Sequence, residues 1–115
     1  MEQINGCTVL NASDDLVRFG SDEIGGSYYA EIGALPPGDP GPPVHFHPHT
    51  DEAFYVADGE ATFLLGDREH RVTAGGFVFI PRGTVHTAWN SGEVPLRGLI
   101  VISPGDAKHE FAPVE

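Results

Sequence analysis

Short apolar runs separated by turn-forming residues are the feature that most limits the fold of this chain. Its 115 residues include 15 glycines and 10 prolines, and no stretch keeps the 3.6-residue periodicity of an amphipathic helix. Turn signals such as Asp58-Gly59, Gly66-Asp67 and Ser91-Gly92 bound runs that have the length of β-strands. We therefore predict strands over residues 8–10, 28–35, 44–47, 53–57, 61–65, 70–73, 77–80, 84–89 and 96–102. Regularly spaced short strands predict an all-β sandwich or barrel.

The length of the chain predicts a single domain. A chain of 115 residues can bury one modest core but not two. We find no internal repeat, low-complexity tract or linker. Between Gly59 and Gly75 there is room only for two strands and a tight turn.

Three histidines and one glutamate have the spacing of metal ligands. His45 and His47 are two residues apart, so on a strand their side chains share one face at about 7 Å separation. Glu52 follows a turn-rich stretch and would open the returning strand of a hairpin. His86, beyond a Pro-Arg-Gly turn, would supply a third imidazole. The sequence thus predicts a site with three nitrogen ligands and one oxygen ligand.

The residues around these four ligands resemble the two motifs of the cupin superfamily. In the first motif, Gly59 stands at the expected distance after Glu52. In the second motif, the residues at the expected distances from His86 are Gly75, Pro81-Arg82-Gly83 and Asn90. One glycine of the pattern is missing, because Asp39 stands six residues before His45, within the Gly/Pro-rich approach 36–43. The resemblance covers roughly residues 36 to 103.

This resemblance implies a jelly-roll β-sandwich or barrel with the metal between two sheets. It divides the single cupin domain, residues 1–115, into an N-terminal arm with edge strands (1–35), a barrel core (36–103) and a C-terminal tail (104–115). In small cupins such N-terminal strands often pair with a second subunit, which implies a homodimer. We also expect the polar tail to form a short helix over the barrel mouth, with Phe111 as a plug.

The acidic composition, together with the lack of a recognisable signal peptide or long apolar segment, predicts a soluble protein that binds small molecules. The formal charge is −11, which would repel nucleic acid and anionic membranes, and there is no basic run. No signal peptide or long apolar segment is recognisable, so we expect a cytoplasmic location. The single Cys7 excludes an intrachain disulfide.

Strand alternation predicts which side chains line the interior. If the side chain of Glu52 points inward, those of Phe54 and Val56 should point inward too. In the same way, Ala88 should point inward if His86 does. The predicted substrate pocket is Phe54, Val56, Phe79 and Ala88, although plain core packing would account for these apolar residues equally well.

Nearby polar residues are assigned other roles. His49 and Asp51 are interpreted as solvated turn residues rather than ligands, because His49 sits at the hairpin turn and Asp51 has the parity opposite to Glu52. Asn90 is expected to hold backbone in place rather than to bind metal.

The predicted ligand set suits one divalent transition-metal ion per chain, and Fe, Mn, Ni, Co, Cu and Zn all remain open. The stretches 51–56 and 77–83 look most like the quercetin dioxygenase-like branch of the cupins. That resemblance implies a dioxygenase acting on an enolisable or aromatic small molecule, with Glu52 as both ligand and base. Two alternatives stay open: a non-oxidative isomerase, cyclase or lyase that uses the metal as a Lewis acid, and a non-catalytic ligand-binding or sensory cupin.

Overall fold

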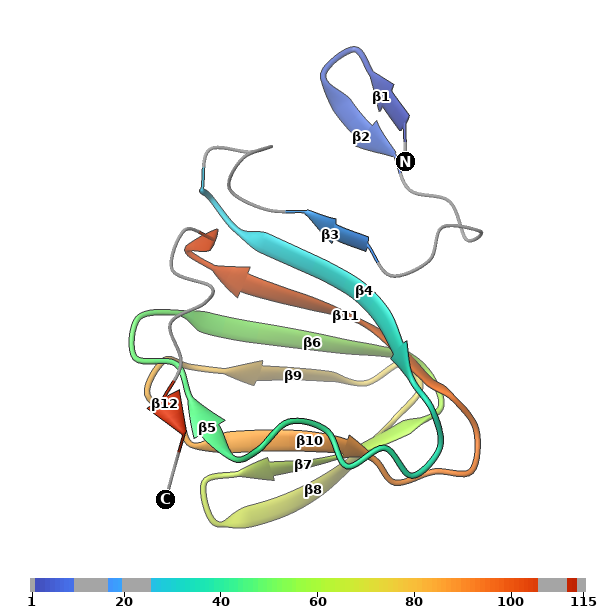
Figure 1. The fold of residues 1–115 in the computed structure, drawn as a ribbon, viewed down its shortest axis with the longest axis vertical. Helices are drawn as coiled ribbons and strands as arrows, with labels where there is room; N and C mark the ends of the chain where they lie inside the picture. Colours follow the sequence, from blue (N-terminus) through green and yellow to red (C-terminus); the bar gives the residue numbers. More distant parts are fainter. Residues whose placement is uncertain (1, 10–16, 20–25, 106–111, 114–115) are drawn as a thin grey trace.

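The computed structural model describes residues 2–9, 17–19, 26–105 and 112–113, which form two facing five-stranded sheets and a separate two-stranded one. One five-stranded sheet has the order β12-β5-β10-β7-β8 and the other the order β3-β4-β11-β6-β9, with antiparallel pairing throughout (Figure 1). The predicted all-β jelly-roll fold is confirmed. The strands are β1 (Glu2–Ile4), β2 (Cys7–Val9), β3 (Val17–Phe19), β4 (Tyr29–Leu35), β5 (His45–Phe46), β6 (Asp51–Asp58), β7 (Glu60–Leu65), β8 (Arg68–Thr73), β9 (Phe77–Ile80), β10 (His86–Asn90), β11 (Leu96–Ser103) and β12 (Ala112–Pro113).

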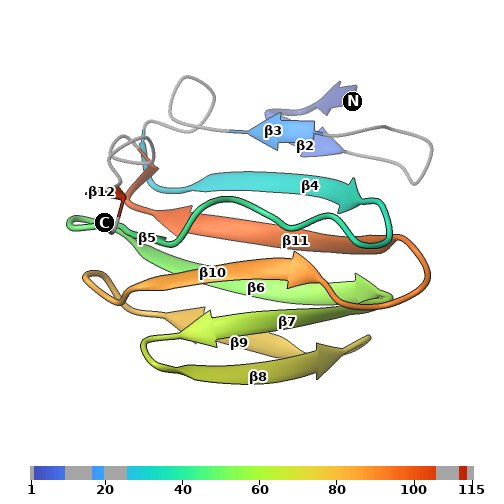
Figure 2. The same cartoon turned by 60° about the horizontal axis from the view of Figure 1, so that its bottom comes forward.

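Most predicted strands of the barrel core form within a few residues of their expected limits. The main difference is β5, which has only two residues, because the chain turns at once toward β6. At the N-terminus β1 and β2 pair only with each other, as a separate two-stranded sheet. The predicted tail helix, with Phe111, lies outside the described residues, whereas β12 pairs with β5 at the edge of its sheet (Figure 2). Within the described ranges, no helix is long and apolar enough to cross a membrane.

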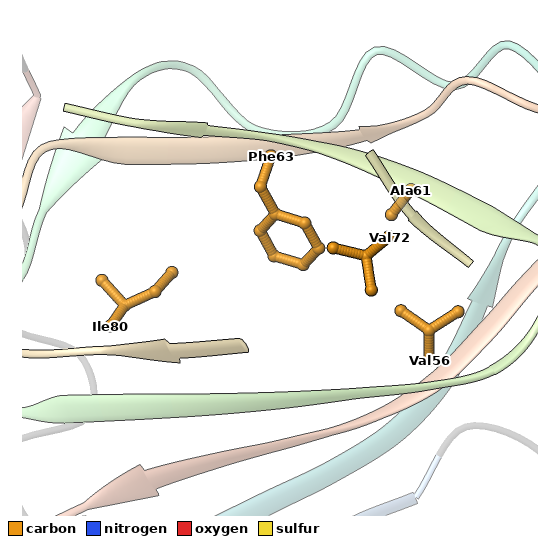
Figure 3. Packing of buried hydrophobic residues seen from close by; sticks show 5 residues of the cluster. All are labelled: Val56, Ala61, Phe63, Val72 and Ile80. Carbon is orange, nitrogen blue, oxygen red and sulfur yellow. The ribbon is translucent and has the colours of Figure 1, made fainter. Parts of the chain in front are cut away.

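The core lies between the two sheets, where apolar side chains from both inner faces meet. Its buried members come from β6, β7, β8 and β9: Val56, Ala61, Phe63, Val72 and Ile80 (Figure 3). The ring of Phe54 meets that of Phe63 edge to face, with centroids 5.2 Å apart. This contact joins the two sheets, because Phe54 is on β6 and Phe63 on β7.

Asn90 fixes two backbone segments at one end of the sandwich. Its side chain is 2% exposed, and its Nδ2 donates hydrogen bonds to the carbonyls of Leu35 (3.1 Å) and Val94 (2.9 Å). Its Oδ1 accepts from the amide of Gly92 at 2.9 Å. Because an unsatisfied buried amide is costly, these bonds hold the end of β4 and the β10–β11 turn together. The expectation that Asn90 holds backbone in place is confirmed.

The approach loop 36–43 packs directly on β10, which explains how the chain accommodates Asp39. The carboxylate of Asp39 accepts from the amide of Gly41 at 2.9 Å, and its carbonyl accepts from the amide of Asn90 at 3.1 Å. Gly41 has φ of +70°, and a Cβ there would lie 1.8 Å from the carbonyl oxygen of Ala88. A glycine is therefore required at position 41, two residues after the place where the family pattern has one.

Candidate metal centre

Both sheets contribute to a cluster of three histidines and one glutamate. His45 on β5 lies directly opposite His86 on β10 in the antiparallel register, and His47 is the first residue after β5. Glu52 comes from β6 in the facing sheet. One ligand atom of each residue lies within 4.8 Å of those of the other three. The sequence-predicted ligand residues are therefore brought together in the fold.

The cluster is compact and largely shielded from solvent. Three of its members are buried, with exposed fractions of 7% for His47, 4% for Glu52 and 3% for His86, while His45 is half-buried. The Oε1 atom of Glu52 is in close contact with Nε2 of His47 and lies 3.6 Å from Nε2 of His86. The latter distance is too long for a good hydrogen bond. A divalent ion would satisfy such a buried carboxylate and the imidazoles that face it.

Backbone carbonyls orient two of the imidazole rings. Nδ1 of His45 lies 2.7 Å from the carbonyl oxygen of Pro43, and Nδ1 of His86 lies 2.9 Å from that of Thr84. A carbonyl can only accept, so each Nδ1 carries the proton and donates it. In the neutral ring this leaves Nε2 with its lone pair, which is the form that binds metal ions.

Burial and the glutamate act in opposite directions on the histidines. Burial lowers the pKa of His45, and the neighbouring imidazoles of His86 and His47 lower it further. The Pro43 carbonyl and Glu52 act to raise this pKa but do not outweigh the other effects. Burial also acts to lower the pKa of His86, but the nearby Glu52 carboxylate, together with the Thr84 carbonyl, outweighs burial and raises that pKa. The carboxylate is thus the main source of favourable field for a cation in this site.

An ion pair connects the turns that carry the ligands. Asp51 accepts hydrogen bonds from the backbone amide of Arg82 (2.9 Å) and from its Nε (3.2 Å), and its second oxygen accepts from Nη2 at 3.2 Å. Close by, the amide of Gly83 donates to the carbonyl of His47 at 2.8 Å. Asp51 is outside the ligand cluster, as expected, but it is not merely a solvated turn residue, because it binds the turn that leads to His86.

The structure places three of the four predicted pocket residues on the inner side of the sheets. Phe54 and Val56 follow Glu52 inward along β6, and Ala88 packs against the same core. Phe79 is 57% exposed, and its placement in the pocket was wrong. The register pairs Phe79 with Ala53, on the outer face, whereas Ile80 pairs with Glu52 and is 2% exposed.

One buried polar group near the ligands was not predicted. Thr50 is 1% exposed, and its Oγ1 makes no hydrogen bond within the described part of the chain. It lies two residues before Glu52, so strand parity was the signal that could have identified it as an interior residue. Its place in a turn obscured that signal.

The fold and the His/Glu cluster together define a β-sandwich with a candidate metal centre between its sheets, and comparison with known proteins agrees with this class. Residues 32–110 match the family described as Cupin domain, so the chain belongs to the cupins. A solved structure of an uncharacterised conserved protein with a double-stranded β-helix domain from Klebsiella pneumoniae is 26% identical, with a TM-score of 0.72. The match covers 93% of this chain and 90% of that one.

Two curated relatives are similar over part of their length. The chain is 35% identical to mannose-1-phosphate guanylyltransferase 2 of Escherichia coli O157:H7 over 89 residues, which are 77% of this chain and 18% of that protein. It is 32% identical to tetracenomycin polyketide synthase protein TcmJ of Streptomyces glaucescens over 71 residues, which are 62% of this chain and 48% of that protein. The chain thus spans about half or less of these relatives.

Proposed function

We propose that the protein is a metal-dependent enzyme acting on an enolisable small molecule, with dioxygenation as the reaction. The observation that carries this proposal is the convergence of His45, His47, Glu52 and His86, whose ligand atoms lie within 4.8 Å of one another. These residues fit a divalent transition-metal ion in both donor type and charge, because three neutral imidazoles and one carboxylate leave a net charge near +1.

The bound ion would act as a Lewis acid on a substrate oxygen and keep the deprotonated substrate next to dioxygen. Three imidazoles and one carboxylate leave one or two coordination positions for other groups at five- or six-coordination. A structural zinc site is typically closed and cysteine-rich, whereas the only cysteine here is the exposed Cys7. The donor set therefore favours a site for reaction or ligand capture.

The protein's own groups would supply proton transfer and a dry environment. Glu52 is buried and has two carboxylate oxygens, so one of them can accept the proton that an enolisable substrate loses. Phe54, Val56 and Ala88 give an apolar inner wall on the core side, which excludes water from the deprotonated substrate. In dioxygenation both atoms of dioxygen enter the product and the electrons come from the substrate, so no further reductant is required.

A non-oxidative isomerase or cyclase is the second candidate. It is favoured by the similarity to TcmJ, which is described as a polyketide synthase protein, because polyketides carry enolisable carbonyl groups. In both candidate reactions, an oxygen atom of the substrate would bind at the ion held by the same four residues, and Glu52 would transfer the proton. They differ in whether dioxygen is consumed.

The deciding experiment measures oxygen uptake by protein samples that are each reconstituted with a different metal. Metal-free protein is loaded with Fe, Mn, Ni, Co, Cu or Zn and mixed with flavonols, β-diketones and enolisable aromatics. Dioxygenation predicts oxygen consumption matched by product in at least one redox-metal form, and none when oxygen is removed. Turnover that continues without oxygen, with Zn as effective as the redox metals, would favour the non-oxidative reaction. Binding without turnover in every form would indicate a sensory cupin.

The variant Glu52→Gln separates ligation from proton transfer. It keeps the shape of the side chain but removes its charge and most of its basicity. We expect product formation to fall by about 100-fold or more in a form that still contains some metal. Unchanged turnover in a metal-loaded Glu52→Gln protein would exclude Glu52 as the base.

A further inference from the structure

Thr50 carries a buried hydroxyl group that the fold itself does not use. The residue is 1% exposed, and within the described ranges its Oγ1 has no hydrogen-bond partner. Such a group costs the folded protein stability, because it loses its hydrogen bonds to water and gains none in exchange. A buried polar atom of this kind in a native protein requires an explanation, and a bound water, ion or ligand is a common one.

The buried polar side chains that hold the fold together are hydrogen-bonded, unlike that of Thr50. Oγ1 of Thr87, which is 7% exposed, donates to the carbonyl of Pro42 at 2.6 Å. The side-chain amide of Asn90 is bonded to three backbone groups. Nε2 of His86, a predicted ligand atom, is buried without a hydrogen bond in the described part of the chain. In this respect the Thr50 hydroxyl resembles a ligand of the cluster rather than a structural polar group.

Thr50 lies on the same side of the chain as Glu52. Asp51 stands between them, pairs with Arg82 and is partly exposed, whereas Thr50 and Glu52 are both buried. On an extended segment, side chains two residues apart share one face at a separation of about 7 Å. The turn that leaves His47 is exposed at its two middle residues and returns to the interior at Thr50. The hydroxyl therefore lies at the end of the sandwich that holds the ligand cluster.

Neither packing nor turn chemistry accounts for a hydroxyl at position 50. Valine has the same branched shape at Cβ and would fill the same space without a polar group to desolvate. Threonine in a turn often bonds to nearby backbone groups, but Oγ1 of Thr50 bonds to none of the described ones. The hydroxyl is therefore left for a group that is not part of the chain.

We propose that Oγ1 of Thr50 donates a hydrogen bond to the anionic ligand that occupies an open coordination position of the metal centre, such as a deprotonated substrate oxygen. This inference rests on the proposed function, because it requires an ion held by the four-residue cluster. A hydroxyl can donate its proton to an anionic oxygen, whereas the ionised carboxylate of Glu52 can only accept. Thr50 thus determines specificity, since its proton favours the substrate in its deprotonated form over the neutral one.

The first measurement is the unfolding of metal-free protein by denaturant, which depends neither on turnover nor on a bound ion. Thr50→Val should unfold at the same denaturant concentration as the wild type or at a higher one, because it removes an unsatisfied hydroxyl. The matched control Thr87→Val removes a hydroxyl that donates to the Pro42 carbonyl, so it should unfold at a clearly lower concentration. A midpoint for Thr50→Val as low as that of Thr87→Val would overturn the proposal, because the hydroxyl would then have a partner within the chain.

The second measurement is anion binding to the cobalt-reconstituted protein, with azide as the probe and visible absorption as the readout. Thr50→Val should retain cobalt but bind azide about tenfold or more weakly than the wild type, because a hydrogen bond to a charged ligand is lost. Thr50→Ser keeps the hydroxyl and should bind azide with an affinity close to that of the wild type.

Three results of the azide titration would overturn the proposal. Equal azide affinity in Thr50→Val and the wild type would remove the role of Thr50 and leave the metal centre intact. Azide binding by Thr50→Ser as weak as that by Thr50→Val would mean that the shape of the side chain matters rather than its hydroxyl. A wild-type protein that holds no cobalt or other transition metal would instead refute the metal centre, and the role of Thr50 with it.

Discussion

Asp51 and Arg82 form a three-point contact between residues that are 31 positions apart in the chain. Asp51 immediately precedes Glu52, and Arg82 lies in the turn that leads to His86. Because both sit within a few residues of a predicted ligand, their contact sets the position of the glutamate relative to the last histidine. The pair therefore belongs to the support of the candidate site, although neither side chain is in it.

The first prediction concerns this support. Arg82→Lys keeps the charge but loses the planar fork that matches a carboxylate. We expect metal affinity to fall by up to about tenfold, at the low end of the effect of outer-shell partners, with little change in melting temperature. Competition with a chelator measures the affinity, and Arg68→Lys, on exposed β8, is the matched control. Equal affinities in the two variants would contradict the role given to Arg82.

The second prediction is a pH effect of the same pair. The hydrogen bonds and charge of Arg82 hold the pKa of the Asp51 carboxyl below its usual range. A carboxyl whose pKa is lowered by folding stabilises the protein above its ordinary pKa, and this contribution is lost as the pH falls through the folded-state value. Carbon-detected NMR titration should give the Asp51 carboxyl a pKa below its ordinary value, and this pKa should be higher in Arg82→Ala. An unchanged titration in Arg82→Ala would refute the assignment.

The third prediction is that metal content follows the cluster. Purified or reconstituted protein should hold close to one transition-metal ion per chain, and His47→Ala or His86→Ala should lose it. Loss of the ion should also lower the melting temperature, since an ion that binds only the folded state contributes about 2.7 kcal/mol at 100 times its dissociation constant. Elemental analysis and calorimetry provide the measurements. His70→Ala, on exposed β8, should keep its metal, and full occupancy in the double ligand variant would reject the site.

The fourth prediction uses two glycines of the same loop. Gly38 and Gly41 both have positive φ, but a Cβ at position 38 meets nothing within 4 Å, whereas one at position 41 would clash with the Ala88 carbonyl. Gly38→Ala should cost about 1–2 kcal/mol from backbone strain alone. Gly41→Ala should cost clearly more, because β10 or the loop must move. Denaturant unfolding measures both, and equal costs would mean that the loop does not rest on β10.

Much of the fold and of the ligand set could be predicted because the governing signals are local. Turn residues limit the strands, and the two-residue period puts His45 and His47 on one face. The same period placed Phe54 and Val56 on the inner side behind Glu52. Such features depend on residues that are close in sequence.

The features that were missed depend on pairing between distant segments. Phe79 was placed in the pocket because it is large and apolar, but its direction follows from the β6–β9 register, which sets it beside Ala53. The partner of Asp51 lies in another turn, which no local pattern indicates. The need for glycine at position 41 likewise arises only when the loop meets Ala88.

The placement of the four ligands also has a mechanical consequence. β5 has only two residues, and its one described partner besides β10 is the two-residue β12, so few backbone hydrogen bonds hold His45 in the sheet. An ion bound by all four residues would cross-link β5, β6 and β10 and close a loop of about 40 residues between His45 and His86, as a disulfide does in other small proteins. Metal removal should then loosen one edge of the sandwich first, with amide protons of β5 exchanging early while those of β7 remain protected.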